Sequence, residues 1–158
     1  MATSKISPDS DAVISEIEIA APPERVFAAL THREQALQWG RSEMFEITDW
    51  EMDARLGGKW SYTARERTPG GGHKPERYEH HGEILEFDPP RLLVYTWFAS
   101  YHEDTSHQTI VRWELTPTSG GTRVKVTHSG LAPLPESRKG YAEGWPGLLQ
   151  QIRRFVEK

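Results

Sequence analysis

The sequence predicts a single α+β domain, in which a long C-terminal helix covers an antiparallel sheet. Three observations support this: two short helical segments follow the first strand, six strand-like segments then run on without a helix, and the chain ends in a long helical pattern. The 158 residues suit one domain, and no repeat or long linker divides them. We expect a flexible N-terminal tail at 1–11 and the domain at 12–158.

The first strand and two short helices are expected in the first quarter of the chain. Residues 13–20 alternate with the period of a half-buried strand. Pro23 suits a first helical turn, because the N–H group that proline lacks would have no helical partner there. Thr31 and Glu34 have the spacing of a capping box. A second helix should therefore start after Thr31 and end at Gly40.

Six strands are expected next, because short apolar or alternating segments are separated by turns rich in glycine and proline. Their ranges are 45–52, 58–65, 78–87, 92–99, 109–115 and 122–128. Strands that follow one another in this way pair as an antiparallel meander. With the first strand they make a sheet of about seven strands, in the element order β-α-α-β-β-β-β-β-β-α.

The C-terminal helix is expected to lie on the sheet, since no other element has enough apolar surface to cover it. Its apolar residues recur at helical intervals and form one stripe: Tyr141, Trp145, Leu148, Leu149, Ile152, Phe155 and Val156. Pro146 cannot donate a hydrogen bond to the carbonyl of Ala142. We therefore expect either a kink near Gly144 or a helix that starts there.

Composition argues against several functions. Cysteine is absent, which excludes disulfides, zinc–thiolate sites and a cysteine nucleophile, and fits a cytoplasmic location. The formal net charge of -4, without a clustered basic face, argues against nucleic acid as a partner. No segment approaches the roughly 20 apolar residues that cross a bilayer, so no membrane partner is expected. The seven histidines lack a rigid ligand spacing and no cofactor motif occurs, so we expect neither metal nor cofactor.

Several ordered motifs resemble those of a known superfamily. They are residues 21–30, Trp39, residues 56–60, 82–97 and 121–130, and the pair Gly144 and Trp145. Together they span about residues 13–156 and are similar to the START-like superfamily (SRPBCC, Bet v-like), in the branch related to the activator of heat-shock protein 90 ATPase. The resemblance implies the helix-grip fold, a strongly curved sheet wrapped around the last helix, with an internal cavity between them.

The resemblance implies no single activity, because relatives include binders of lipids and small molecules, cyclases and dehydratases of aromatic polyketides, and a co-chaperone. For this chain we expect a cavity that binds a small hydrophobic or aromatic molecule. The alternatives are a cyclase or dehydratase that uses the cavity, a lyase or isomerase in class, and an interaction module of the chaperone-ATPase-activator type in a stress response. A chaperone or a second copy of the chain would then be a protein partner.

Aromatic and histidine side chains on inward faces are the candidate binding residues. The chain has six tryptophans, and strand alternation turns several of them inward, where they either line a cavity or fill the core. We expect Trp60, Trp113 and Trp145 to face one shared space. The full set is Trp39, Trp60, Tyr62, Tyr78, His80, Trp97, Trp113, His128, Trp145 and Leu149.

The two histidines of this set have different expectations. His128 shares a strand face with Val126, so its imidazole could orient a ligand carbonyl or act as a general base, and it is the only catalytic candidate. The alternative is a histidine whose nitrogens are satisfied by neighbouring protein groups. His80 is expected to point inward unless a bulge at Gly82 reverses its face.

Overall fold

The computed structural model describes residues 2–67 and 76–158, which form one antiparallel sheet and three helices. The strands are β1 (Thr3–Ile6), β2 (Val13–Ile19), β3 (Phe45–Met52), β4 (Lys59–Glu66), β5 (Arg77–Asp88), β6 (Leu92–Ala99), β7 (Thr109–Thr118) and β8 (Gly121–Ser129). The helices are α1 (Pro23–Thr31), α2 (Arg33–Trp39) and α3 (Pro135–Val156). The predicted α+β class is confirmed.

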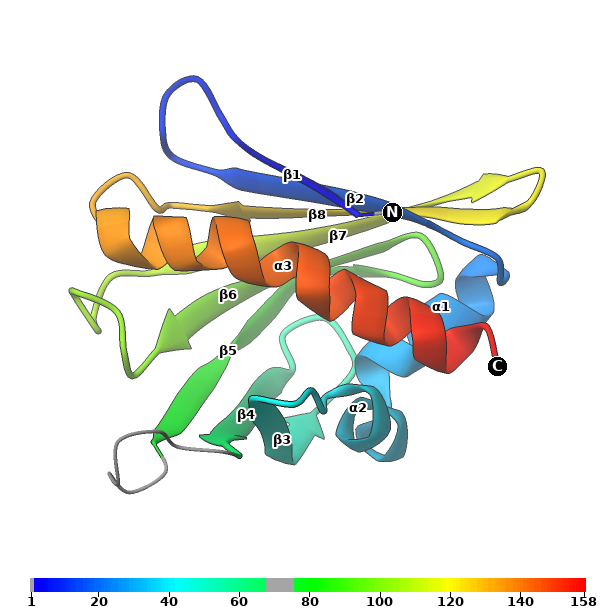
Figure 1. The fold of residues 1–158 in the computed structure, drawn as a ribbon, viewed down its shortest axis with the longest axis horizontal. Helices are drawn as coiled ribbons and strands as arrows, with labels where there is room; N and C mark the ends of the chain where they lie inside the picture. The colour runs from blue at the N-terminus through cyan, green and yellow to red at the C-terminus, as the bar shows by residue number, and fades with distance from the viewer. Residues whose placement is uncertain (1, 68–75) are drawn as a thin grey trace.

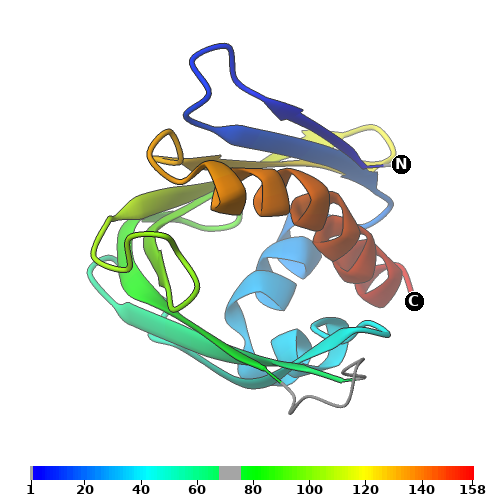
Figure 2. The ribbon, with the colours of Figure 1, turned by 60° about the vertical axis from the view of Figure 1, so that its left-hand side comes forward.

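The sheet has the strand order β1-β2-β8-β7-β6-β5-β4-β3. It curves strongly, and α3 lies in the hollow of the curve (Figure 1), with α1 and α2 beside its C-terminal half (Figure 2). Helix α3 packs on β1, β2, α1 and α2. This is the helix-grip arrangement, in which the helix covers the concave face of the sheet.

The described residues contain eight strands, one more than expected, because residues 3–6 form β1. Residues 3–6 belong to the sheet, so the flexible tail expected at 1–11 is wrong for them. Strand β1 pairs antiparallel with β2, from Thr3 opposite Glu16 to Ile6 opposite Val13. All four of its side chains are exposed, so the strand has no apolar pattern that a sequence reading could detect. Backbone hydrogen bonds with β2 define it instead.

The capping box predicted at Thr31 is wrong. Thr31 is the last residue of α1, and its hydroxyl donates a hydrogen bond of 3.0 Å to the carbonyl of Phe27. Helix α2 begins at Arg33 after His32, which makes no side-chain cap, and it ends before Gly40 as predicted. The T-x-x-E spacing therefore fell across the end of one helix and the start of the next.

Helix α3 runs without interruption from Pro135 through Pro146, so a helix start at Gly144 is excluded. Its axis bends about midway (Figures 1 and 2). A proline inside a helix removes one hydrogen bond and crowds the preceding turn, which explains a bend at this place. The inner face buries Trp145, Leu149, Ile152 and Val156 almost completely.

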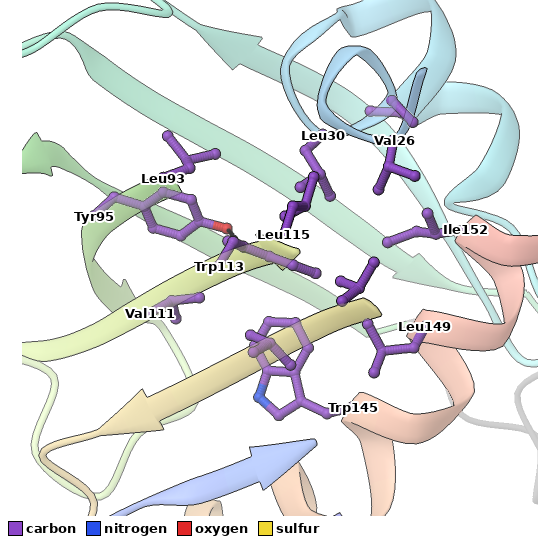
Figure 3. Close-up of a cluster of buried hydrophobic side chains, with 14 of the residues drawn as sticks. Val26, Leu30, Leu93, Tyr95, Val111, Trp113, Leu115, Trp145, Leu149 and Ile152 are labelled. Carbon is purple, nitrogen blue, oxygen red and sulfur yellow. Dashed lines mark hydrogen bonds between the residues drawn. The ribbon is translucent and has the colours of Figure 1, made fainter. Parts of the chain in front are cut away.

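The core lies between α3, α1 and the central strands. Figure 3 shows side chains from these elements converging on one region: Val26, Leu30, Leu93, Tyr95, Val111, Trp113, Leu115, Trp145, Leu149 and Ile152. Leu149 and Val111 have no exposed surface. This filled region occupies one end of the curved sheet's interior, and the open space lies at the other end, beside β3 to β6.

Candidate functional site

A cleft of about 770 Å³ opens between α3 and the outer strands of the sheet. Strands β3, β4, β5 and β6 supply one wall, and residues between 136 and 151 of α3 supply the other. Met44 and Phe45 lie at its border with 62% and 37% of their surface exposed. Large apolar side chains are therefore available to a ligand without any rearrangement of the core.

A second hollow of about 710 Å³ lies near the turn between β7 and β8 and the start of α1. Proline, glycine, alanine and backbone groups make up most of its lining, and no aromatic side chain contributes. The cleft beside α3 brings aromatic rings and polar groups together, which is the composition typical of ligand sites. It is therefore the candidate functional site.

Five of the predicted binding residues line this cleft, and they are Tyr62, Tyr78, His80, Trp97 and Trp145. The other five predicted residues belong to the core or its edge and do not line it: Trp39, Trp60, Trp113, His128 and Leu149. Strand alternation gave the inward face of the strand residues in both groups, whereas Trp39, Trp145 and Leu149 lie on helices. It could not tell which inward side chains lie under α3 and which lie beside the open end.

The wall contributed by the sheet is a layer of rings. Tyr62 stacks on His80 with a centroid separation of 3.9 Å and an interplanar angle of 10°. Trp97 meets the same two rings edge to face, at 5.7 and 5.1 Å. The hydroxyl of Tyr62 makes no hydrogen bond to another described residue. His80 and Trp97 are each 4% exposed, so this layer offers the cleft mainly the partly exposed ring of Tyr62 and its free hydroxyl.

His80 points inward because β4 and β5 stay in register past Gly82. A Cβ at Gly82 would lie 1.9 Å from the carbonyl oxygen of Thr96 and 2.6 Å from Nε1 of Trp60. The close approach of these groups explains why glycine is needed there. The register shift in β5 comes later, between Ile84 and Glu86, so it does not turn His80 outward.

A directed chain of hydrogen bonds begins at His80. Its Nδ1 lies 3.3 Å from the carbonyl oxygen of Tyr62, which can only accept, so Nδ1 carries a proton and donates. Burial lowers the pKa of His80 to about 3, and its ring is neutral at physiological pH. Nε2 therefore accepts, and its partner at 3.1 Å is the hydroxyl of Tyr101. Tyr101 donates its only proton to His80.

The direction of the remaining bonds follows from Tyr101. Since its proton is used, Tyr101 accepts from the hydroxyl of Tyr141 at 2.8 Å. Tyr141 then accepts from Nε1 of Trp97 at 3.0 Å and from Nε2 of His102 at 2.6 Å. Tyr141 uses its one proton and both lone pairs, and Tyr101 keeps one lone pair free. The cleft thus offers an acceptor at Tyr101.

The groups of this network are uncharged at neutral pH. Burial raises the pKa of Tyr101 and of Tyr141 above the ordinary tyrosine value. Burial also lowers the pKa of His102, although the nearby Glu103 carboxylate acts in the opposite direction. Nδ1 of His102 is buried and finds no hydrogen-bond partner among the described residues. The network therefore works as a neutral scaffold that fixes Tyr101 and Trp97.

His128 is a core residue. It has no exposed surface, and burial lowers its pKa well below the ordinary value. Nδ1 accepts a hydrogen bond of 3.3 Å from Nε1 of Trp145, and Nε2 donates one of 2.9 Å to the hydroxyl of Thr109. The Thr109 hydroxyl in turn donates a hydrogen bond of 2.7 Å to the carbonyl of Trp97. Both imidazole nitrogens are used, so the structure brings no free nitrogen of His128 to a ligand.

The shared space expected between Trp60, Trp113 and Trp145 is filled. Nε1 of Trp113 donates to the hydroxyl of Tyr95 at 2.8 Å, and the ring meets Trp145 edge to face at 5.6 Å. Trp60 donates to the carbonyl of Thr96 at 3.0 Å. Each indole N–H has a protein partner, which is the arrangement of core rings.

The wall contributed by α3 was predicted through Trp145, but its glycines were not. Gly140, Gly144 and Gly147 line the cleft, and a Cβ built on any of them meets no atom within 4 Å. Glycine inside a helix is about 1 kcal/mol less favourable than alanine, and no close contact requires it here. These residues leave the helix backbone bare on the side of the cleft. Their spacing of four and three residues was the available sequence signal.

Loop residues of the site were also missed. Tyr101 and His102 lie between β6 and β7, where no periodic pattern indicates which way a side chain points. Glu103 comes from the same loop, and its carboxylate accepts hydrogen bonds from the N–H of Glu136 at 2.9 Å and the hydroxyl of Ser137 at 2.5 Å. Glu103 thus caps the N-terminus of α3, which the α3 sequence itself leaves uncapped.

In residues 2–67 and 76–158, no three histidine, aspartate or glutamate side chains come together as metal ligands. None of the described helices is long and apolar enough to cross a membrane.

The similarity of the chain to known proteins shows its family. The sequence profile of the activator of Hsp90 ATPase homolog 1-like protein family matches residues 20–157. The chain belongs to this family. The START-like resemblance noted in the sequence is therefore confirmed at the level of its branch. No protein in the curated set matches the chain.

Solved structures of family members and other bacterial proteins have the same fold. A Silicibacter pomeroyi protein described as AHSA1 is 25% identical, with 92% of this chain and 97% of that chain covered and a TM-score of 0.73. A Chromobacterium violaceum protein is 25% identical, with 94% and 99% covered and a TM-score of 0.75. A Rhodobacter sphaeroides protein is 19% identical, with 99% and 95% covered and a TM-score of 0.76, and this likeness shows the fold alone.

Proposed function

We propose that this family member binds a small, flat hydrophobic or aromatic molecule in the cleft between α3 and strands β3 to β6. The observation that carries the proposal is an open cleft of about 770 Å³ whose walls are ring faces on one side and bare helix backbone on the other. Sites for small molecules have volumes of roughly 300–1,000 Å³ and are mainly apolar with a few oriented polar groups.

The two walls support a flat ligand in different ways. The rings of Tyr62, Tyr78 and Tyr101 keep exposed surface in the cleft and supply aromatic contacts, which add to the burial of apolar surface. The glycines of α3 allow a planar group to approach the helix closely. The Tyr62 hydroxyl and the free lone pair of Tyr101 supply the polar contacts that orient it.

Binding is a better account of this site than acid–base catalysis. A general base works best with a pKa near the operating pH. Burial lowers the pKa of His80 to about 3, and its two nitrogens are engaged with Tyr62 and Tyr101. His128 is engaged in the core in the same way. A cyclase or dehydratase would need a proton acceptor that these histidines do not provide.

A protein-interaction role is the second candidate, and membership of a family named for an activator of a chaperone ATPase favours it. On this alternative a chaperone, or a second copy of the chain, would contact the protein surface during a stress response. Under either function we propose a cytoplasmic location, because the sequence contains no cysteine. Copurification of a chaperone with a tagged protein whose cleft is blocked would favour the interaction module.

A blocked cleft also tests the binding proposal. N-phenylnaphthylamine, a neutral probe that brightens in apolar sites, should bind the natural protein with a saturable signal. Gly144→Leu should abolish this signal while keeping or raising the melting temperature, because the new side chain enters open space and leucine is a better helix former than glycine. Arg154→Leu adds the same side chain at an exposed position of α3 away from the cleft and should leave binding intact. Equal binding by both variants would contradict the proposal.

A further inference from the structure

We propose that the ligand of this cleft is an aromatic cation, an amine-bearing flat molecule, and that the cleft discriminates against anions of the same shape. This inference rests on the proposed binding function and adds the chemical class of the ligand. It is carried by the charges that line the cleft, by the direction of its hydrogen bonds and by its ring faces.

The charged side chains that line the cleft are all acidic. They are Glu46, Glu103, Glu136 and Glu143, and no lysine or arginine lines it within the described residues. His80 also lines it, but burial lowers its pKa to about 3 and leaves the ring neutral. A bound anion would therefore face carboxylates with no compensating positive side chain among the described lining residues.

Two of the four carboxylates are already satisfied. Glu46 pairs with Arg65 at 2.5 Å and approaches Arg41 at 4.0 Å, and these arginines help to lower its pKa. Glu103 accepts hydrogen bonds from the first turn of α3. A helix N-terminus ordinarily attracts anions, and here Glu103 occupies that position. The N-terminus of α3, where an anionic ligand would have been favoured, is therefore already occupied by the Glu103 carboxylate.

The other two carboxylates are available. Glu136 and Glu143 are exposed, lie on the same face of α3 with Gly140 between them, and form no ion pair with a described residue. Arg138, which lies nearby in sequence, directs its guanidinium to the carbonyls of Ser10, Leu131 and Ala132. A cationic group seated over Gly140 would lie between two carboxylates and close to bare helix backbone.

The opposite wall also prefers a cation. The rings of Tyr62, Tyr78 and Tyr101, which keep exposed surface in the cleft, carry the negative side of the ring quadrupole on their faces, and this attracts positive charge. Tyr101 donates its proton to His80 and offers only a lone pair to the cleft. An ammonium N–H matches that lone pair, whereas a carboxylate or phosphate oxygen does not. The free Tyr62 hydroxyl can donate or accept and so favours neither charge. The ring faces and the Tyr101 lone pair therefore decide the preference of this wall, and it agrees with that of the acidic wall on α3.

Three probes with one naphthalene skeleton test the charge preference by calorimetric titration: naphthylmethylamine as the cation, naphthylmethanol as the neutral molecule and naphthoate as the anion. The cation should bind about tenfold more tightly than the anion, with the neutral probe between them. Added salt should reduce the difference in affinity between the cation and the anion, because the carboxylates of Glu136 and Glu143 are exposed and salt screens them. Naphthoate binding as tightly as naphthylmethylamine would overturn the inference.

A charge variant separates this inference from the binding function itself. Glu136→Gln/Glu143→Gln should weaken the binding of naphthylmethylamine towards the affinity for naphthylmethanol, leaving only the part of the preference that the rings and Tyr101 supply, and should leave the binding of naphthylmethanol unchanged. Glu24→Gln/Glu34→Gln removes the same charge from exposed sites outside the cleft and should change neither. Naphthylmethanol binding with no cation preference would contradict the ligand class alone. Binding of none of the three probes would contradict the proposed function as well.

Discussion

The hydroxyl oxygens of Tyr141 and Tyr101 lie 2.8 Å apart, and this contact joins α3 to the loop between β6 and β7. Tyr141 belongs to the apolar stripe of the last helix, yet its hydroxyl also receives the N–H groups of Trp97 and His102. One side chain therefore closes the core on one side and orders the polar edge of the cleft on the other.

Tyr141→Phe should destabilise the protein by about 1–3 kcal/mol, because it leaves the buried donors of Trp97 and His102 without an acceptor. Urea denaturation monitored by circular dichroism measures this. Tyr78→Phe is the control, since among the described residues that hydroxyl bonds to Glu76 alone, at 3.2 Å, and it should change stability by less than about 0.5 kcal/mol. Equal effects of the two variants would show that the network contributes nothing.

Leu149→Ala should cost about 2–5 kcal/mol, because Leu149 has no exposed surface and lies at the centre of the contact between α3 and the core (Figure 3). Chemical denaturation measures this loss in the free energy of unfolding. Leu85→Ala is the matched control on β5, where the side chain is 42% exposed, and should cost less than about 1 kcal/mol. A Leu149→Ala loss of that smaller size would contradict the grip of α3 on the sheet.

His128→Gln should also destabilise the fold, by about 1–3 kcal/mol, since glutamine cannot keep both hydrogen bonds to Trp145 and Thr109 in the same geometry. This revises the expectation that His128 is a ligand group. Thermal melting and titration with N-phenylnaphthylamine distinguish the two roles. If the variant is as stable as the natural protein but no longer binds N-phenylnaphthylamine, the imidazole contacts the ligand and its structural role is wrong.

Stability should fall as the pH drops below about 6.5. The folded-state pKa of His80 is about 3, and those of His102 and His128 are also lowered, whereas an unfolded histidine titrates near 6.5. The unfolded chain then binds more protons, so the free energy of unfolding decreases on acidification from about 6.5 towards 3. Denaturation at pH 7.5 and 5.5 checks this window (about one unit on each side of 6.5). Replacing His80 with Gln should reduce the slope, and an unchanged slope would contradict the assignment.

The sequence predicted the direction of side chains correctly where a periodic apolar pattern had only one surface against which it could be buried. The stripe that includes Trp145 and Ile152 predicted the buried face of α3, and alternation predicted that His80 points inward. Strand β1 was missed because an edge strand with four exposed side chains is defined by its backbone pairing alone. The capping box at Thr31 failed because the same spacing also fits a helix end.

The cleft was predicted only in part, and the reason is geometric. Trp97 and Trp113 have the same alternation on neighbouring strands, but only Trp97 reaches the cleft, because α3 covers the position of Trp113. Which inward residue stays uncovered depends on where the helix crosses the sheet, and periodicity carries no information about that crossing. Tyr101 lies in a loop, where side-chain direction follows from tertiary contacts alone.

The packing of the indoles has an optical consequence. Trp60 lies 5.2 Å from Trp97, Trp97 lies 5.8 Å from Trp145, and Trp145 lies 5.6 Å from Trp113, as distances between ring centroids. Rings this close exchange excitation energy and couple their electronic transitions. The four indoles therefore behave as one chromophore that extends from the core to the cleft. A molecule that touches only Trp97 will change the emission and the near-ultraviolet circular dichroism of all four.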